Sequence, residues 1–443
     1  MIFLKDKVNL AFVSAYVILV SSFIYIPANP SVKVILYILI FSFSFLIYLY
    51  LFFRNKNKID FSFKEIILIA LLFKIILLFV QPITTEDYTR YIWDGKVQSS
   101  SGINPFKYAP QDTALSHLRD NDIYPQLTFK EIKTIYPPFA QLIFLLNQFI
   151  FSGSLIGLKI LFLLFDLGVI YFLYKIILHL DLNKHSILLY TLSPLVLLEV
   201  NLNAHVDILL LFFLTGSIYF CLKRNVSLAF LFLGFSVMAK IYSILFLPLL
   251  LVYFFDRKNF KTLLIGLIFF IIPCLIILPY MNGLSGILET MKNYNDNWYF
   301  NALPFKAVAE LFRYYGMENH KIIRSAFSIL FLFILGYLTF SSKPFLTKLT
   351  LIIFFYFLLN TTVHPWYLII LSAVLVFNFN YTFLFWTGIV GLTNLTVYQY
   401  KLSGVWGDNN YVLAFEYVVL ILAFILEYKT SFNLKQSTAV TNE

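Results

Sequence analysis

The chain has 443 residues, of which 60% are hydrophobic, 19% are aromatic and only 13% are charged, and its mean hydropathy is +0.81. A soluble domain of this length does not need apolar side chains on every face of its helices, so the composition excludes a soluble globular protein. The formal net charge of +10 does not indicate nucleic acid, because many basic residues form short clusters between apolar runs, as topology signals and anionic lipid contacts do. Cys221 and Cys274 lie among apolar residues and offer neither a disulfide framework nor a zinc site.

The apolar runs show almost no strict alternation of polar and apolar residues, which favours helices over a β-barrel. Several runs are shorter than the roughly 20 residues of a full crossing, so we expect some broken or half-helices around a protein-enclosed cavity. The sequence therefore predicts an all-α polytopic transmembrane bundle with about 11 to 14 membrane segments. Apolar segments are expected near 8–27, 32–53, 63–82, 137–151, 157–178, 186–200, 206–222, 226–255, 262–280, 322–341, 349–363, 366–378, 381–396 and 411–428.

Two polar stretches, 83–136 and 281–321, divide the apolar segments. We expect one membrane domain over 1–443, in which these stretches form the first and second outer loops and the first loop carries interfacial helices. The basic residues expected in the cytoplasm are Lys5, Lys7, the cluster 54–58, Lys429 and Lys435.

With those residues inside, three crossings place 83–136 outside. If every later segment crosses once, Lys223-Arg224 lies outside, against the positive-inside rule. If 137–151 and 226–255 are re-entrant, the number of crossings between the two polar stretches stays even, so both stretches remain outside. Lys223-Arg224 then moves inside. We prefer this second arrangement.

The acid pair Glu86-Asp87 opens the first polar stretch, directly after the third apolar segment. A carboxylate there can take the proton from a sugar hydroxyl that attacks an activated anomeric carbon, or can hold a metal ion. Repulsion between the neighbours raises the pKa of one acid. The alternative is an ordinary pair of solvated loop acids.

The residues after the acid pair predict an interfacial helix with an aromatic, cation-bearing face. Arg90, Tyr91, Trp93 and Asp94 form this face. Prolines in Tyr136-Pro137-Pro138 predict the first turn of a further helix, from which Gln141 is expected to reach the cavity.

Polar residues also interrupt the apolar segments around 201–207. A hinge with Asn203, His205 and Asp207 is costly in lipid and is expected to face water, protein or substrate. Simple alternation of crossings, however, places this hinge on the cytoplasmic side. Glu199 and Asp166 are interpreted as structural acids that face the bundle interior.

Two further motifs are candidates for substrate binding. Lys240, followed by Ile241 and Tyr242, is suited to a lipid-linked phosphate, with snorkelling to the interface as the alternative. His364 precedes a helix-stopping proline and the interfacial residues Trp366 and Tyr367, so it is expected to point into the outer cavity, where it can bind a phosphate oxygen. In the second outer loop, Trp298 and its polar neighbours are candidates for an acceptor lip, or form a plain loop.

The ordered set of these motifs over about 83–367 resembles the polytopic GT-C glycosyltransferases that use a polyprenyl-phosphate sugar. It is most similar to the bacterial branch of polyprenyl-phosphate-mannose-dependent, mannosyltransferase-like enzymes. The resemblance implies an outer-facing site, an inverting transfer and a catalytic acid in the first large outer loop. The family's acidic pair falls on Glu86 and Asp87, and we assign the base to Asp87. Glu86 then supports it, or both hold a divalent cation such as Mg²⁺ or Mn²⁺.

These observations lead to one hypothesis and two rivals. The hypothesis is transfer of a hexose, mannose above all, from a polyprenyl-phosphate donor to a glycan, glycolipid or protein on the outer face of the cytoplasmic membrane. The rivals are a lipid-linked saccharide flippase or transporter, for which we find no internal repeat, and an outer-face glycan polymerase or ligase. Arg90, Lys240 and His364 are candidates for the phosphate, and Tyr91, Trp93, Trp298 and Trp366 for stacking on sugars. The substrate-binding residues we expect are Arg90, Tyr91, Trp93, Asp94, His205, Asp207, Lys240, Tyr242, His364, Trp366 and Tyr367.

Overall fold

The computed structural model describes residues 6–25, 29–55, 63–100, 102–255, 260–317 and 319–440. About 80% of the structure is helical, and the described ranges contain no strands, which confirms the predicted all-α membrane bundle. A single isolated bridge between Phe300 and Thr362 is the β-type pairing found among them.

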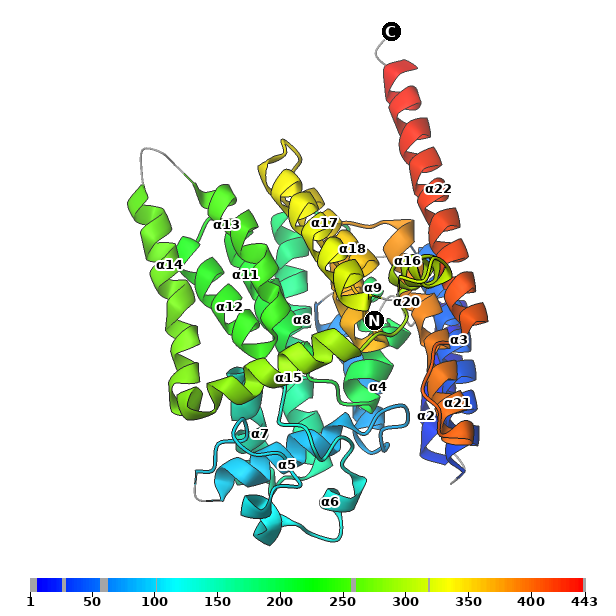
Figure 1. Ribbon diagram of the computed structural model, residues 1–443. Helices are drawn as coiled ribbons and strands as arrows, with labels where there is room; N and C mark the ends of the chain where they lie inside the picture. Colours follow the sequence, from blue (N-terminus) through cyan, green and yellow to red (C-terminus); the bar gives the residue numbers. More distant parts are fainter. Residues whose placement is uncertain are drawn as a thin grey trace.

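The α-helices follow one another along the whole described chain (Figure 1). Their bounds are α2 Lys7–Ser21, α3 Pro30–Asn55, α4 Phe63–Leu78, α5 Asp87–Ser99, α6 Ile123–Gln126, α7 Pro138–Phe151, α8 Leu155–His179, α9 Leu188–Thr191, α10 Pro194–Val196, α11 Asp207–Leu222, α12 Val226–Ala239, α13 Leu247–Phe254, α14 Phe260–Cys274, α15 Leu284–Asn297, α16 Leu303–Tyr314, α17 His320–Phe340, α18 Phe345–Leu359, α19 Ile369–Phe377, α20 Tyr381–Ile389, α21 Leu395–Ser403 and α22 Asn410–Val440. The short turns of 3-10 helix are η1 Ser22–Tyr25, η2 Thr113–Leu118, η3 Lys184–Ile187, η5 Ile241–Phe246, η6 Leu275–Gly283, η7 Pro365–Leu368 and η8 Val390–Asn394, and η4, Leu197–Leu202, is a π-helix.

Six helical segments of the described chain are long and apolar enough to cross a membrane: Lys7–Tyr25, Pro30–Asn55, Leu155–His179, Phe260–Asn297, His320–Phe340 and Asn410–Thr430. A seventh span arises if Lys184–Thr191 and Pro194–Leu202, bent by 42°, form one broken crossing. The other apolar helices have 10–17 residues, shorter than the roughly 20 of a full crossing, as the lengths of the apolar runs indicate. The chain is a multi-pass membrane protein, and the expected total of 11 to 14 segments stays a prediction.

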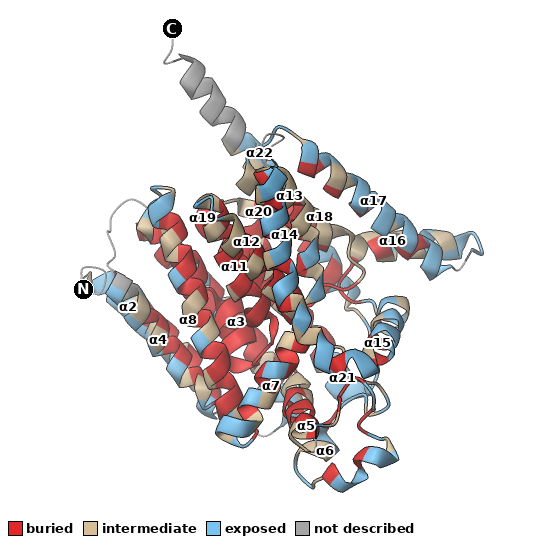
Figure 2. Cartoon of the chain, turned by 90° about the vertical axis from the view of Figure 1, so that its left-hand side faces the viewer, coloured by how far each residue is buried: buried red, intermediate tan, exposed pale blue. Residues whose placement is uncertain are grey.

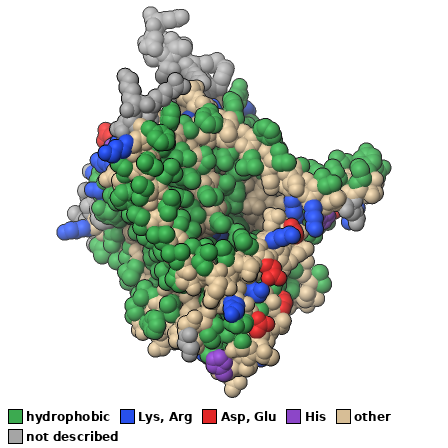
Figure 3. Space-filling model, turned by 60° about the vertical axis from the view of Figure 1, so that its left-hand side comes forward, with side chains coloured by type: hydrophobic (Ala, Val, Ile, Leu, Met, Phe, Trp, Pro, Cys, Tyr) green, Lys and Arg blue, Asp and Glu red, His purple; other side chains and the backbone are tan. Residues whose placement is uncertain are grey.

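One hydrophobic core runs through the bundle, from Val13 in α2 to Leu420 in α22. Buried side chains fill the centre, while α14 to α17 carry many exposed residues (Figure 2). Figure 3 shows a broad hydrophobic surface with a hollow near its middle and most charged side chains at its margins. Apolar side chains outside the core are what a lipid-facing surface requires.

The segment 226–255 folds back on itself. Helix α12 ends at Ala239, the chain turns at Lys240, and η5 with α13 returns it. The Arg224 guanidinium, just before α12, lies 4.2 Å from the ring centre of Tyr253, near the end of α13. Both ends of the segment therefore lie together and Lys240 lies at its tip, as the re-entrant arrangement requires.

Arg54, a basic residue expected on the cytoplasmic side, lies where the beginning of α2 and the end of α3 meet. Arg54 at the end of α3 pairs with Asp6 before α2, at 3.3 Å. His185 in η3 contacts the Phe52 carbonyl oxygen at 2.7 Å. Lys5, positions 56–58 of the basic cluster and the side chain of Lys435 lie outside the described residues.

The first polar stretch and α15 of the second gather at the opposite end, which is the lower end in Figure 1. Helix α7 packs on α5 there, and begins at Pro138 with Pro137 as its N-cap, which confirms the predicted helix start. The Asn104 side-chain amide donates to the Tyr280 carbonyl oxygen at 3.1 Å and to Asn282 Oδ1 at 2.5 Å. The two polar stretches are therefore fastened to each other.

Candidate functional site

The hinge between α10 and α11 has an irregular backbone. Residues 197–202 form a π-helix, and Ala204 adopts a left-handed conformation with φ 60°. Both features are uncommon, and both are found frequently at functional sites. The hinge brings His205 and Asp207 to the end of the bundle that carries Asp87. The electrostatic interaction of both residues with the Asp87 carboxylate shows this proximity. The hinge therefore lies on the same side as Asp87, and the simple alternation of crossings, which places it on the opposite side, is wrong.

Asp87 is the first residue of α5, and its backbone N–H donates to Thr85 Oγ1 at 3.1 Å. Burial raises the pKa of its carboxyl above the ordinary value, and the nearby Glu86 and Asp207 add to the rise. His205 and Lys240 oppose it through their favourable interaction with the carboxylate. Asp87 is thus a partly desolvated acid that faces one cation, and its raised pKa suits a general base.

The cation is Lys240, at the tip of the folded-back segment. Its ammonium lies 2.5 Å from Asp207 Oδ1 and 4.0 Å from the ring centre of Tyr367. Tyr242 lies farther away, with its ring centre 5.9 Å from the ammonium. The Lys240 side chain keeps 20% of its surface exposed, so it is not sealed into the bundle as Lys74 is. A positive charge that is paired and still accessible can meet a phosphate.

Four rings form a continuous stack beside these charges. The His205 and Trp366 rings lie 4.0 Å apart, those of Trp366 and His364 lie 4.2 Å apart, and that of Phe300 lies 4.7 Å from His364. Burial, with the neighbouring Lys240 and His205, lowers the pKa of His364 well below its ordinary value. His364 is therefore neutral at physiological pH, so it can contribute hydrogen bonding and stacking but no charge.

Several expected residues lie in a hydrogen-bond network within the first polar stretch, apart from this cluster. Arg90 Nε donates to Asp94 Oδ1 at 2.9 Å, and Arg90 also donates to the Ile132 carbonyl oxygen at 2.9 Å. Gln141 donates to Asp94 Oδ2 at 3.0 Å, so it holds the loop instead of reaching the cavity. Trp93 is 1% exposed and belongs to a small separate core with Leu115.

Tyr91 and Glu86 lie at the border of the cluster. Tyr91 is buried, its ring lies 4.7 Å from that of Phe144, and Asp87 acts on it electrostatically. Glu86 turns away from the cluster, because its carboxylate pairs at 2.5 Å with Lys401 in α21. The two members of the acid pair therefore have different environments.

The structure adds Lys401, which was not singled out in the sequence, and shows new partners for Tyr294, Trp298 and Glu199. The Tyr294 hydroxyl lies 3.0 Å from that of Tyr367, and Trp298 stacks on Tyr294 at 5.9 Å. Lys401 reaches Glu86 over 315 positions, a distance that no local pattern reveals. Glu199, interpreted as a structural acid, lies 3.0 Å from His205 Nδ1.

The described residues do not form a ready-made site for a divalent cation, and a role for Mg²⁺ or Mn²⁺ stays a prediction. Within the described ranges, no three His, Cys, Asp or Glu residues converge as metal ligands. Glu86 is held by Lys401, and Asp207 by Lys240, so the carboxylates near Asp87 already have cationic partners. A hard cation such as Mg²⁺ needs several oxygen ligands, and we derive no catalytic step through one.

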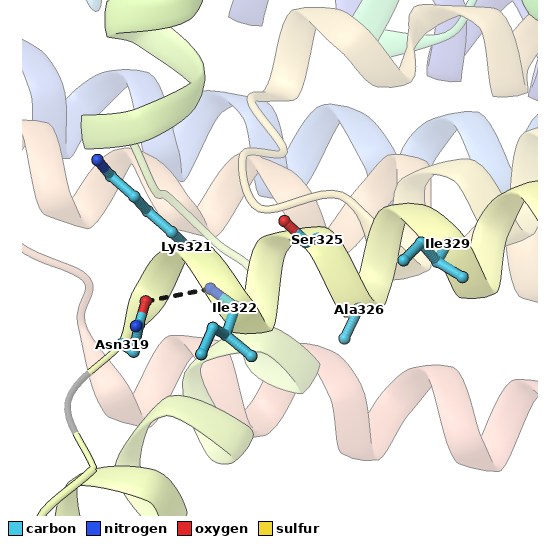
Figure 4. A pocket seen from close by; sticks show the side chains of 6 residues that line it. All are labelled: Asn319, Lys321, Ile322, Ser325, Ala326 and Ile329. Carbon is cyan, nitrogen blue, oxygen red and sulfur yellow. Dashed lines mark hydrogen bonds between the residues drawn. The ribbon is translucent and has the colours of Figure 1, made fainter.

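A shallow, open pocket of about 420 Å³ lies along α17, lined by Asn319, Lys321, Ile322, Ser325, Ala326 and Ile329 (Figure 4). None of the expected site residues lines it. The hydrogen bond drawn there is the helix cap from the Ile322 N–H to Asn319 Oδ1, at 3.2 Å. The pocket is therefore separate from the cluster around Asp87.

The family model described as alpha-(1->6)-mannopyranosyltransferase, N-terminal domain (MptA_B family) matches residues 11–256. This range is more than half of the chain and contains Asp87, His205, Asp207 and Lys240. A comparison with curated proteins finds no match. The chain therefore belongs to the MptA_B family of alpha-(1->6)-mannopyranosyltransferases, and it is a membrane glycosyltransferase of the mannosyltransferase type.

Proposed function

We propose that the protein transfers mannose from a polyprenyl-phosphate donor to a hydroxyl group of a glycan, glycolipid or protein acceptor. The site faces the outer side of the cytoplasmic membrane in this proposal. The observation that carries it is the meeting of Asp87, the Asp207–Lys240 pair and the stack of His205 with Trp366 at one end of an apolar bundle.

Asp87 is the base in this reaction. It takes the proton from the acceptor hydroxyl as the acceptor oxygen bonds to the anomeric carbon of mannose. The bond from that carbon to the phosphate oxygen breaks, its electron pair leaves with polyprenyl phosphate, and the anomeric configuration inverts. The raised pKa of Asp87 supports this role, because a base whose pKa lies nearer to neutral accepts a proton more readily than an ordinary aspartate. Glu86 supports Asp87 through its charge, since its carboxylate is bound to Lys401.

The Lys240 ammonium stabilises the leaving phosphate, on which negative charge grows as the bond breaks. Arg90 is committed to Asp94 and to a backbone carbonyl, and His364 is neutral, so the phosphate has Lys240 as its cation in the cluster. Tyr367 offers aromatic surface for the sugar ring, next to the edge of Trp366, whose ring is stacked between His205 and His364. The lipid chain enters from the hydrophobic surface with the hollow shown in Figure 3.

The test uses purified protein with polyprenyl-phosphate mannose, GDP-mannose or a mannosyl lipid diphosphate as alternative donors, and a panel of mannoside acceptors. We expect polyprenyl phosphate to appear together with a mannosylated acceptor for the first donor alone. Transfer from a lipid diphosphate would favour a polymerase or ligase. Transbilayer movement of the intact lipid in liposomes, without product, would favour a flippase and contradict the proposal.

A further inference from the structure

Glu199 and His205 form a buried pair within the hinge. Both side chains have essentially no exposed surface, and His205 Nδ1 lies 3.0 Å from Glu199 Oε2 and 3.1 Å from the Glu199 carbonyl oxygen. Two oxygen acceptors on one side of the ring require the hydrogen to be on Nδ1. Hydrogen bonding at one ring nitrogen selects the role of the other, as it does for histidines held by a carboxylate.

The opposite edge of the same ring has no protein partner. His205 Nε2 is buried, yet it makes no hydrogen bond within the described chain. Buried polar atoms are nearly always satisfied, so an orphan of this kind needs a specific explanation. Its place supplies one, because His205 interacts with the Asp87 carboxylate and stacks on Trp366 at 4.0 Å.

The Glu199 carboxylate is itself held from two sides. The Tyr37 hydroxyl donates to Oε1 at 2.8 Å, and Asn203 Nδ2 donates to Oε2 at 3.3 Å. Asn203 also donates to Thr84 Oγ1 at 2.8 Å, and its Oδ1 accepts from the Ile83 N–H at 3.1 Å. The same network therefore joins the hinge to the residues that lead directly into Asp87.

The backbone of the hinge serves this arrangement. The left-handed Ala204 lets the chain turn so that the His205 N–H reaches the Glu199 carbonyl oxygen at 3.0 Å. The π-helix precedes this turn, and such irregular segments are usually kept where a side chain must be aimed. A merely structural acid needs neither feature, as Asp166 shows: it lies in regular α8 and is bound by Lys74 and Tyr190.

We propose that Glu199 is a positioning residue that holds His205 with its Nε2 free to form a hydrogen bond with one hydroxyl group of the donor mannose. The inference rests on the proposed function and adds a basis for sugar recognition to it. A site built to bind a substrate hydroxyl discriminates strongly against an analogue that lacks it, because its own polar group is then left unpaired.

The experiment combines variants with a series of polyprenyl-phosphate mannose donors that each lack one ring hydroxyl. Wild-type protein is expected to lose about 10²-fold or more in kcat/KM for one of these donors. His205→Gln places its side-chain amide near the position that Nε2 had, whereas His205→Asn places its amide near the position that Nδ1 had. We expect His205→Asn to use that deoxy donor and the full donor equally well, and His205→Gln to keep part of the discrimination.

Glu199→Gln is the second variant, because it keeps the shape of the side chain. We expect a loss of about 10–100-fold in kcat/KM for the full donor, the usual effect of removing a residue that orients another, with the discrimination weakened. Asp166→Asn is the matched control, a buried acid of the same bundle, and should keep the wild-type discrimination. The inference is overturned if wild-type protein transfers mannose but His205→Asn and Glu199→Gln discriminate among the donors as it does. Absence of wild-type transfer from the full donor instead contradicts the proposed function.

Discussion

The Lys240 ammonium lies 2.5 Å from the Asp207 carboxylate, although the two residues are 33 positions apart and belong to different segments. Lys240 stands at the tip of the folded-back segment, and Asp207 at the first turn of α11. The same ammonium acts favourably on Asp87. One cation is thus shared by two carboxylates, which makes the protonation of Asp87 depend on Lys240.

Replacement of Lys240 by Gln tests this dependence. Lys240 lowers the pKa of Asp87, so its removal raises that pKa further. The base is active when deprotonated, and kcat/KM must therefore begin to rise at a higher pH in Lys240→Gln than in the wild type. The measurement is the pH profile of mannose transfer. Lys133→Gln, which removes a lysine of an exposed pair with Glu289, should leave the profile in place. A Lys240→Gln profile that superimposes on the wild type would show that the two groups are not coupled.

Trp366 joins the hinge to the loop before η7. Its ring stacks between those of His205 and His364, and each aromatic pair of this kind contributes about 0.5–1.5 kcal/mol. We expect Trp366→Leu to lower Tm in detergent and to raise KM for the donor, and Trp366→Phe to retain part of both. Equal KM values for the wild type and Trp366→Leu would show that Trp366 does not contribute to donor binding.

Replacement of Asp94 tests whether this residue stabilises the first polar stretch or binds the substrate. It is 1% exposed and accepts hydrogen bonds from Arg90 and Gln141. A buried hydrogen-bonding group left without its partner costs about 1–3 kcal/mol, so Asp94→Asn should loosen the first polar stretch. Hydrogen exchange over 102–136 is expected to accelerate, while KM of the folded fraction changes little. A large rise in KM with unchanged hydrogen exchange would show that Asp94 binds the substrate, as the sequence predicted.

Asn301 fastens the loop that carries Phe300. Its N–H donates to Asp408 Oδ1 at 3.0 Å and its side-chain amide to Glu416 Oε1 at 3.2 Å, while Phe300 stacks on His364. Asn301 has a left-handed φ of 52°, which Gly adopts without strain. Asn301→Gly therefore removes the side-chain bond alone, and we expect KM to rise with little change in Tm. An unchanged KM would show that this loop does not shape the donor site.

Much of this site could be predicted because polar groups in an apolar chain need partners. Asp87, His205, Asp207, Lys240 and His364 all interrupt or border apolar segments, and the structure brings them together. The roles of Arg90 and Trp93 could not be separated from the sequence, since a loop that packs on itself has the same residue types as one that binds sugar.

Two other features lay beyond the reach of sequence patterns. Glu199 reaches His205 over six positions, a spacing that a regular α-helix does not place on one face and that the π-helix and Ala204 make possible. The segment 226–255 folds back at a turn around Lys240. The sequence does not reveal this turn, because the apolar residues on both sides read as one continuous run. The positive-inside rule favoured a fold-back there, because it weighs charges and not segment lengths, and the re-entrant arrangement of 137–151 stays a prediction.

The central claim is that Asp87 is the base at a site that takes mannose from polyprenyl phosphate. Its most direct test is the rate of polyprenyl phosphate release by wild-type protein, Asp87→Asn and Glu86→Gln, purified to the same monodispersity and supplied with the same donor and acceptor. We expect release by the wild type, a loss of at least about 10²-fold in Asp87→Asn, as for the removal of a general base, and a smaller loss in Glu86→Gln. Wild-type rates in Asp87→Asn would contradict the account.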